Sequence, residues 1–226
     1  MTDLERELHR RYEVRTERFS HAGFEVEMLL PRSADALIDD SEFNEDERLP
    51  YWAELWPSAR ALTRFLLDGP APGGPVLELG CGVALPSLAL RARGAAALAT
   101  DYYGEALEFA RASAERNGIP SPELALLDWR HPPPELGRFP LVVAADVLYE
   151  RRNADALAAL LPRVVAPSGS ALLADPGRVY AGEFERGMGE AGWGVEVAAV
   201  LREEAAGAGA YSSVRLLRLS PPPQNR

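Results

Sequence analysis

The sequence has few of the residues that form disulfides and metal centres. Among its 226 residues it has one cysteine, Cys81, and three histidines, which stand far apart at His9, His21 and His131. A single thiol excludes an internal disulfide and suits a reducing compartment. Because a metal site needs several such ligands close together, we expect no metal.

Long apolar runs and an excess of basic charge are absent too. Charged residues such as Arg91, Arg93 and Arg163 interrupt the apolar stretches, so no segment has the length of a membrane span. The net charge is −10, from 24 basic and 34 acidic residues, and this counts against nucleic acid as the main partner. The first residues alternate charges, unlike a secretory leader. We expect a cytoplasmic monomer without a membrane or nucleic-acid partner.

From residue 76 onward, short apolar runs alternate with amphipathic helical segments. This rhythm is typical of βαβ units and a parallel sheet. It predicts an α/β fold with a Rossmann-like, doubly wound sheet of seven strands, mostly parallel with an antiparallel C-terminal strand. The expected strands are residues 76–79, 96–100, 123–127, 141–145, 170–174, 195–201 and 211–219. Ligands bind such sheets beyond the carboxyl ends of the strands.

The N-terminal residues have a different pattern. Thr2 and Glu5 form a capping box for a short helix, and two alternating stretches after it predict a hairpin. We expect Ser58 and Asn153 to cap two later helices. The expected organisation is an extension of the core with helix, hairpin and lid loop (1–57), a cofactor-binding domain (58–219) and a flexible tail (220–226).

A glycine loop follows the first core strand and opens a helix. Gly80 and Gly82 let the backbone approach a ligand, and the helix N-terminus favours an anionic group. Asp101 ends the next strand, where a carboxylate can accept both hydroxyls of a ribose. Leu85 stands where a dinucleotide fingerprint needs its third glycine, so a nucleoside with an amino-acid head is favoured over a pyrophosphate. A tight turn without a ligand is the alternative.

Polar and aromatic residues also follow the third and fourth strands. Asp128 can accept from the exocyclic amine of an adenine, and Trp129 can contact its ring or simply cap the core. Asp146 and Tyr149 can face one cleft, where the carboxylate would hold a cationic amine and the phenol would offer its ring or oxygen. The alternative is that Asp146 caps a helix and Tyr149 packs.

Two further segments can line the same cleft. Residues 50–58 place two tryptophans and a carboxylate before a helix, as in a lid that excludes water, although a hydrophobic staple explains one tryptophan. Residues 175–178 follow the fifth strand, and a Pro-Gly turn explains their shape equally well. The acidic stretch 35–47 would draw in a basic acceptor or merely keep the chain soluble.

These segments together resemble a known family. The sequence is similar to class I, seven-β-strand S-adenosylmethionine-dependent methyltransferases, and more specifically to protein-lysine methyltransferases with a D-x-x-Y motif after the fourth strand. The residues that carry the resemblance are YWAELWPS (51–58), VLELGCG (76–82), TD (100–101), LDW (127–129) and ADVLY (145–149). The first of these, together with ADPGR (174–178), resembles the electron-transfer-flavoprotein β-subunit lysine methyltransferase branch.

The resemblance implies a cofactor, a reaction and a set of site residues. The cofactor would be S-adenosylmethionine, and the reaction an in-line transfer of its methyl group to a lysine of a protein partner, with S-adenosylhomocysteine as product. Asp146 and Tyr149 would form the active-site pair. The implied cofactor contacts are Trp56, Gly80, Cys81, Gly82, Asp101, Trp129 and Ala145, to which the motif positions add Glu78 and Asp128.

Three other functions fit parts of the pattern. One is a small-molecule N-methyltransferase that acts on a nicotinamide-like amine. Another is a non-catalytic S-adenosylmethionine-binding module, against which the intact glycine loop, Asp146 and Tyr149 argue. The third, a nicotinamide-dependent oxidoreductase, is disfavoured by Leu85.

Overall fold

A computed structural model describes residues 1–33, 50–204 and 210–223 of the chain. The acidic stretch 35–47 and the end of the expected tail, residues 224–226, lie outside the described residues. Within them, no helix is long and apolar enough to cross a membrane.

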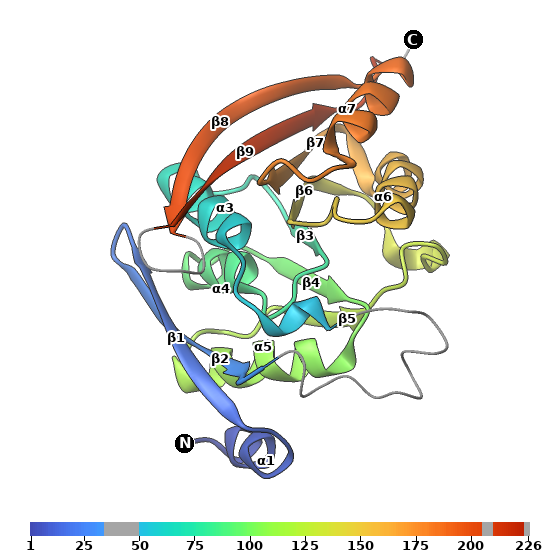
Figure 1. Cartoon of the computed structure of the whole chain (residues 1–226). Coiled ribbons are helices and arrows are strands. Elements are labelled where there is room, and N and C mark those ends of the chain that lie inside the picture. Colours follow the sequence, from blue (N-terminus) through green and yellow to red (C-terminus); the bar gives the residue numbers. More distant parts are fainter. Residues whose placement is uncertain (34–49, 205–209, 224–226) are drawn as a thin grey trace.

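The core is a seven-stranded sheet in the order β5-β4-β3-β6-β7-β9-β8 (Figure 1). Neighbours from β5 to β7 pair in parallel, and β9 runs antiparallel to both β7 and β8. The predicted doubly wound sheet is therefore confirmed. The strands are β3 (Val76–Leu79), β4 (Ala97–Asp101), β5 (Glu123–Leu126), β6 (Phe139–Ala145), β7 (Val165–Asp175), β8 (Gly194–Glu204) and β9 (Tyr211–Ser220).

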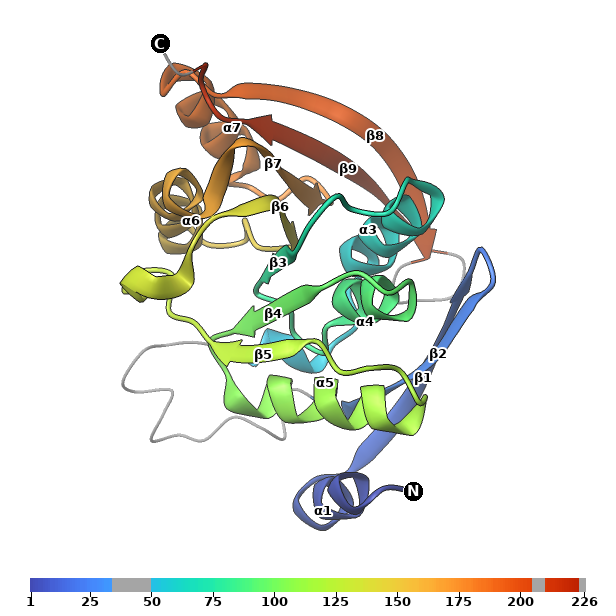
Figure 2. The same ribbon diagram turned by 180° about the vertical axis from the view of Figure 1, so that it is seen from behind.

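Helices cover both faces of this sheet. One face packs against α3 (Pro57–Asp68), α4 (Leu85–Ala92) and α5 (Gly104–Arg116), and the other against α6 (Arg151–Val164) and α7 (Ala181–Glu190) (Figure 2). All four residues of β3 are buried. Burial on both faces explains why β3 is an uninterrupted apolar run apart from Glu78.

The strand order reverses between β4 and β6, which lie on opposite sides of β3. Leu79 at the end of β3 pairs with Thr100 on one side and with Ala144 on the other. The residues that follow these three strand ends are therefore neighbours in space. A short 3₁₀ turn, η2 (Tyr51–Ala53), and the start of α3 lie over the same end of the sheet (Figure 1).

The N-terminal hairpin packs against α5 rather than joining the large sheet. It consists of β1 (Val14–His21) and β2 (Phe24–Pro31), preceded by α1 (Asp3–Arg11), and its two-residue turn has positive φ at Ala22 and Gly23. The amide of Glu5 donates to Thr2 Oγ1 at 3.1 Å, which confirms half of the predicted capping box. The hairpin shares one hydrophobic cluster with α4 and α5.

The predictions that Ser58 caps α3 and that Asn153 caps α6 are wrong. Trp56 is the N-cap of α3, because Pro57 occupies the first helical position, for which its fixed φ suits it. Ser58 is buried inside the first turn. Glu150 is the N-cap of α6, so Asn153 also lies within its helix. The η3 turn (Pro134–Leu136) precedes β6.

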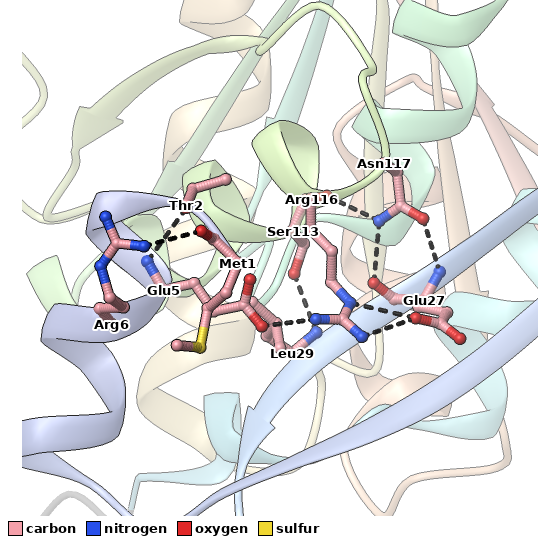
Figure 3. A network of polar contacts seen from close by, with 9 residues as sticks. All are labelled: Met1, Thr2, Glu5, Arg6, Glu27, Leu29, Ser113, Arg116 and Asn117. Carbon is pink, nitrogen blue, oxygen red and sulfur yellow. Dashed lines mark hydrogen bonds and ion pairs between the residues drawn. The ribbon is translucent and has the colours of Figure 1, made fainter.

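A polar network connects α1, β2 and α5 (Figure 3). The guanidinium of Arg116 on α5 forms ion pairs with Glu5 of α1 and with Glu27 of β2, and the Glu5 side chain is only 3% exposed. The side chain of Asn117 accepts from the amide of Glu27 and donates to its carbonyl. Ser113 Oγ accepts from the buried amide of Leu29 at 2.9 Å.

We expect Arg116→Met to lower the free energy of unfolding by about 2–4 kcal/mol, because it leaves the buried Glu5 carboxylate without its cation. Adding Glu5→Gln should restore part of this loss, since no buried charge then remains. Urea unfolding followed by circular dichroism measures both changes. The control Arg18→Met removes an exposed pair with Glu25 and should cost below about 1 kcal/mol. Equal losses for the two arginines would contradict this account of the network.

Candidate functional site

The glycine loop after β3 forms the floor of the site. Gly80 and Gly82 have φ of +64° and +51°, in the left-handed region that favours glycine. A Cβ on Gly80 would lie 3.2 Å from the ring of Trp129, and one on Gly82 would lie 3.4 Å from the carbonyl oxygen of Trp52. Cys81 between them is buried, and burial raises the pKa of its thiol. The tight loop therefore needs both glycines.

Asp101, at the end of β4, holds this loop in place. One carboxylate oxygen accepts from the amide of Gly82 at 2.8 Å, and the other accepts from the amide of Tyr103 at 3.0 Å. A carboxylate oxygen has two lone pairs and can accept more than one hydrogen bond. Asp101 is 6% exposed and lines the cleft above the loop.

Glu78 lies beneath the loop and is fully buried. Burial is the main cause that raises its pKa to about 8, although its carboxylate accepts from the amide and the hydroxyl of Ser87. At neutral pH, Glu78 is therefore largely protonated. Its contacts join the end of β3 to the first turn of α4.

Asp128 and Trp129 lie on the rim after β5. Asp128 accepts from the guanidinium of Arg130 through both oxygens, and this pairing lowers the pKa of Asp128. His131 also contacts this carboxylate. The Trp129 ring packs on Gly80 and faces the cleft. The sequence did not reveal that Arg130 pairs with Asp128.

Asp146 begins the opposite wall, directly after β6. It has a φ of +59°, a region in which aspartate is one of the few non-glycine residues found, and its side chain is 3% exposed. Its carboxylate accepts from Arg178 Nε at 2.6 Å and from Ser58 Oγ at 3.3 Å. Residues 175–178 thus reach Asp146 through the Arg178 side chain. Ser58, which was predicted to cap α3, instead donates to Asp146.

An aromatic wall formed by Tyr51, Trp56 and Tyr149 lies beside Asp146. The rings of Tyr51 and Tyr149 meet edge to face with centroids 5.2 Å apart, and those of Tyr51 and Trp56 are 6.1 Å apart. Trp56 Nε1 donates to the carbonyl of Tyr51 at 2.8 Å, which fixes the indole. Sequence reasoning did not select Tyr51, although it stands within the aromatic segment 50–58.

One cleft brings all the predicted site residues together. Its cavity volume is about 120 Å³, and it is lined by Trp56, Glu78, Gly80, Cys81, Gly82, Asp101, Asp128, Trp129, Ala145, Asp146 and Tyr149. The residues present fit a nucleoside with an amino-acid head: the glycine loop, with its left-handed Gly80 and Gly82, and the buried carboxylate of Asp101 line the same cleft. Within the described residues, no cluster of His, Cys, Asp or Glu could hold a metal ion.

Comparison with known proteins agrees with this arrangement. Residues 76–169 match the methyltransferase domain family. The chain is 38% identical over 135 residues to the electron transfer flavoprotein beta subunit lysine methyltransferase of Xenopus laevis. This match covers 57% of this chain and 53% of the relative. The chain is 28% identical over 116 residues to the mouse histone-arginine methyltransferase METTL23. This second match covers 48% of this chain and 46% of the relative.

The fold has solved counterparts as well. The magnesium protoporphyrin IX methyltransferase ChlM from Synechocystis, solved with bound S-adenosylmethionine, superimposes with a TM-score of 0.58 at 16% identity, over 89% of this chain and 100% of that one. The chain spans about half the length of the curated relatives it matches.

The fold, the matched domain and the site together place the chain among the class I S-adenosylmethionine-dependent methyltransferases. Within that class its sequence is similar, over about half of its length, to the electron transfer flavoprotein β-subunit lysine methyltransferases.

The raised pKa of Glu78 predicts a specific dependence of stability on pH. The folded pKa of about 8 lies above the unfolded value of about 4.5. The contribution of Glu78 to the free energy of unfolding is therefore fully present below pH 4.5 and is lost as pH rises through 8. We expect Glu78→Gln to remove a few kcal/mol of this decline, at about 1.4 kcal/mol per pKa unit. Urea unfolding at several pH values measures it, with Glu123→Gln on β5 as an exposed control. Parallel profiles for the wild type and Glu78→Gln would contradict the assignment.

Proposed function

We propose that this protein is an N-methyltransferase that transfers the methyl group of S-adenosylmethionine to a lysine side chain of another protein. The observation that carries the proposal is the position of Asp146 and Tyr149, which face the same cleft as the glycine loop. A buried carboxylate and an aromatic wall beside a nucleoside site match the needs of an amine acceptor.

The residues that would hold the cofactor follow from the floor of the cleft. The backbone of the loop at Gly80 and Gly82 would receive the amino-acid head, Asp101 the ribose hydroxyls, and the Asp128–Trp129 rim the adenine. When bound, S-adenosylmethionine supplies an electrophilic methyl group on a sulfonium sulfur.

The opposite wall would receive the acceptor. The aromatic wall offers apolar ring faces to the methylene chain of a lysine, and Asp146 can accept a hydrogen bond from the amine. The amine attacks in its neutral form, so that a C–N bond forms as the C–S bond breaks and the electron pair stays on sulfur. The proton that the amine gives up passes to water.

The comparisons support a protein acceptor rather than a small molecule. The relatives named above are enzymes whose names specify a lysine of a flavoprotein subunit and an arginine of a histone. Lysine is favoured because the electron transfer flavoprotein branch has the higher identity, 38% against 28%. We propose in addition that the protein acts as a cytoplasmic monomer, without nucleic acid or membrane as a partner.

Isothermal titration with S-adenosylhomocysteine tests the cofactor half of the proposal. We expect micromolar binding, and we expect Asp101→Ala to weaken it at least about tenfold, because the variant loses the ribose acceptor and the Gly82 contact. Asp155→Ala, an exposed aspartate on α6, is the control and should bind as the wild type does. No binding by the wild type at millimolar ligand would contradict the proposal.

Transfer of a radioactive methyl group tests the acceptor half. The purified electron transfer flavoprotein β subunit and a whole-cell lysate serve as acceptors, and mass spectrometry identifies the modified residue. The chain itself contains no lysine, since all 24 of its basic residues are arginine, so any methyl-lysine lies on the acceptor. Label found only in small molecules would favour a small-molecule N-methyltransferase that acts on a nicotinamide-like amine. Label found only on arginine would favour arginine methylation of a protein.

In the same assay, Asp146→Asn should lower kcat at least about 100-fold, because asparagine keeps the left-handed backbone but not the carboxylate that orients the amine. Its affinity for S-adenosylhomocysteine should stay within about twofold of the wild type. Turnover at the wild-type rate would refute the role of Asp146.

A further inference from the structure

The contact between Arg178 and Asp146 has a consequence for the proposed reaction. Arg178 Nε lies 2.6 Å from Asp146 Oδ1, and the guanidinium carbon lies 5.4 Å from the centre of the Trp56 ring. The Asp146 side chain is 3% exposed, whereas that of Arg178 is 34% exposed. A carboxylate buried to this extent is costly unless a cation accompanies it.

The turn before α7 builds this arrangement. Asp175 Oδ1 accepts from the amides of Gly177 and Arg178, at 2.7 Å and 2.9 Å, so the turn is closed by its own first residue. Gly177 has a φ of +95°, which a side chain at this position would strain. The turn thus holds the backbone of Arg178 in place. The Arg178 guanidinium lies over the indole of Trp56, which is itself held by its hydrogen bond to the Tyr51 carbonyl. Its hydrogen bond to Asp146 raises the pKa of Arg178.

An unaccompanied Asp146 would oppose the reaction that it serves. A buried carboxylate beside an amine stabilises the ammonium form and raises the pKa of that amine. Methyl transfer needs the neutral amine, whose lone pair forms the new bond. A second cation near the carboxylate offsets this effect and lets the amine lose its proton at lower pH.

We infer that Arg178 is a positioning residue for the proposed lysine methylation: it stays paired with Asp146 during turnover, so that Asp146 accepts an N–H from the acceptor amine without holding the amine as an ammonium ion. The inference rests on the proposed function and specifies how its acceptor site is tuned. The guanidinium contributes charge and orientation through Asp146 and does not touch the acceptor.

Other ionisable groups line the same cleft or lie close to Asp146, and they bear on any pH profile. Asp175 comes from the end of β7, and burial raises its pKa. Tyr149 and Glu150 follow Asp146 in sequence, Tyr51 and Glu54 come from the segment before α3, and Glu78 and Asp101 come from the ends of β3 and β4. All of them are retained in the variants below, so a difference between profiles reports the loss of the Arg178 charge.

The test compares pH profiles of kcat for the full chain, with the electron transfer flavoprotein β subunit as acceptor, from about pH 6 to about pH 9.5. For Arg178→Met we expect the acidic limb to move at least about one pH unit to higher pH, with kcat at neutral pH reduced about tenfold. Arg178→Lys keeps the charge and should restore the wild-type limb. Arg178→Gln provides a second neutral variant should the methionine variant not fold.

Two controls separate this effect from a structural one. Arg64→Met removes another partly buried ion pair, with Glu203 on β8, and should leave the pH profile unchanged. The affinity of each Arg178 variant for S-adenosylhomocysteine should stay within about twofold of the wild type, and circular dichroism should show the wild-type fold.

Three outcomes would overturn the inference while the wild type remains active. One is an acidic limb that does not move in either neutral variant. Another is a lower KM with a higher kcat, since Arg178 would then block the acceptor. The third is methylation of the Arg178→Lys chain on its own single lysine, because the side chain at 178 would then occupy the acceptor's place. A wild type that methylates neither the β subunit nor a protein of the lysate would instead refute the proposed function, and the inference with it.

Discussion

The parallel pairing of β3 with β4 on one side and β6 on the other is the constraint on which the site depends. Because Leu79 is level with Thr100 and with Ala144, the chain leaves the sheet three times at one place. Those three exits carry the glycine loop, Asp101 and Asp146. Within the described residues, the glycine loop, Asp101 and the buried carboxylate of Asp146 line one cleft at this edge of the sheet.

Charge inside the cleft is compensated almost group by group. Asp101 accepts from backbone amides, Asp128 is paired with Arg130, Asp146 is paired with Arg178, and Glu78 holds a proton near neutral pH. A low-dielectric cleft cannot hold several unaccompanied carboxylates, so each is accommodated in its own way. The net charge of −10 therefore does not describe the cleft.

The sequence predicted the sheet well, because the sheet depends on local patterns, and the residues that it selected as a site line one cleft. Apolar runs of about five residues mark buried strands, and functional side chains stand directly after them. It did not predict contacts between distant segments. Ser58 reads locally as a helix cap, yet Pro57 takes the first helical position and the Ser58 hydroxyl turns to Asp146, 88 residues away. The partnership of Arg178 with Asp146 likewise spans 32 residues and depends on the tertiary structure.

The N-terminal hairpin, which lies outside the large sheet, reaches the cleft through the segment before α3. Arg15 of β1 pairs with Glu54, while Trp52 packs on Phe109 of α5 and places its carbonyl beside Gly82. Tyr51, next to Trp52, forms part of the aromatic wall. The hairpin, α5 and the aromatic wall are thus connected through direct contacts. Because the Trp52 carbonyl also lies beside Gly82, a change in how the hairpin sits on α5 would reach both the aromatic wall and the glycine loop.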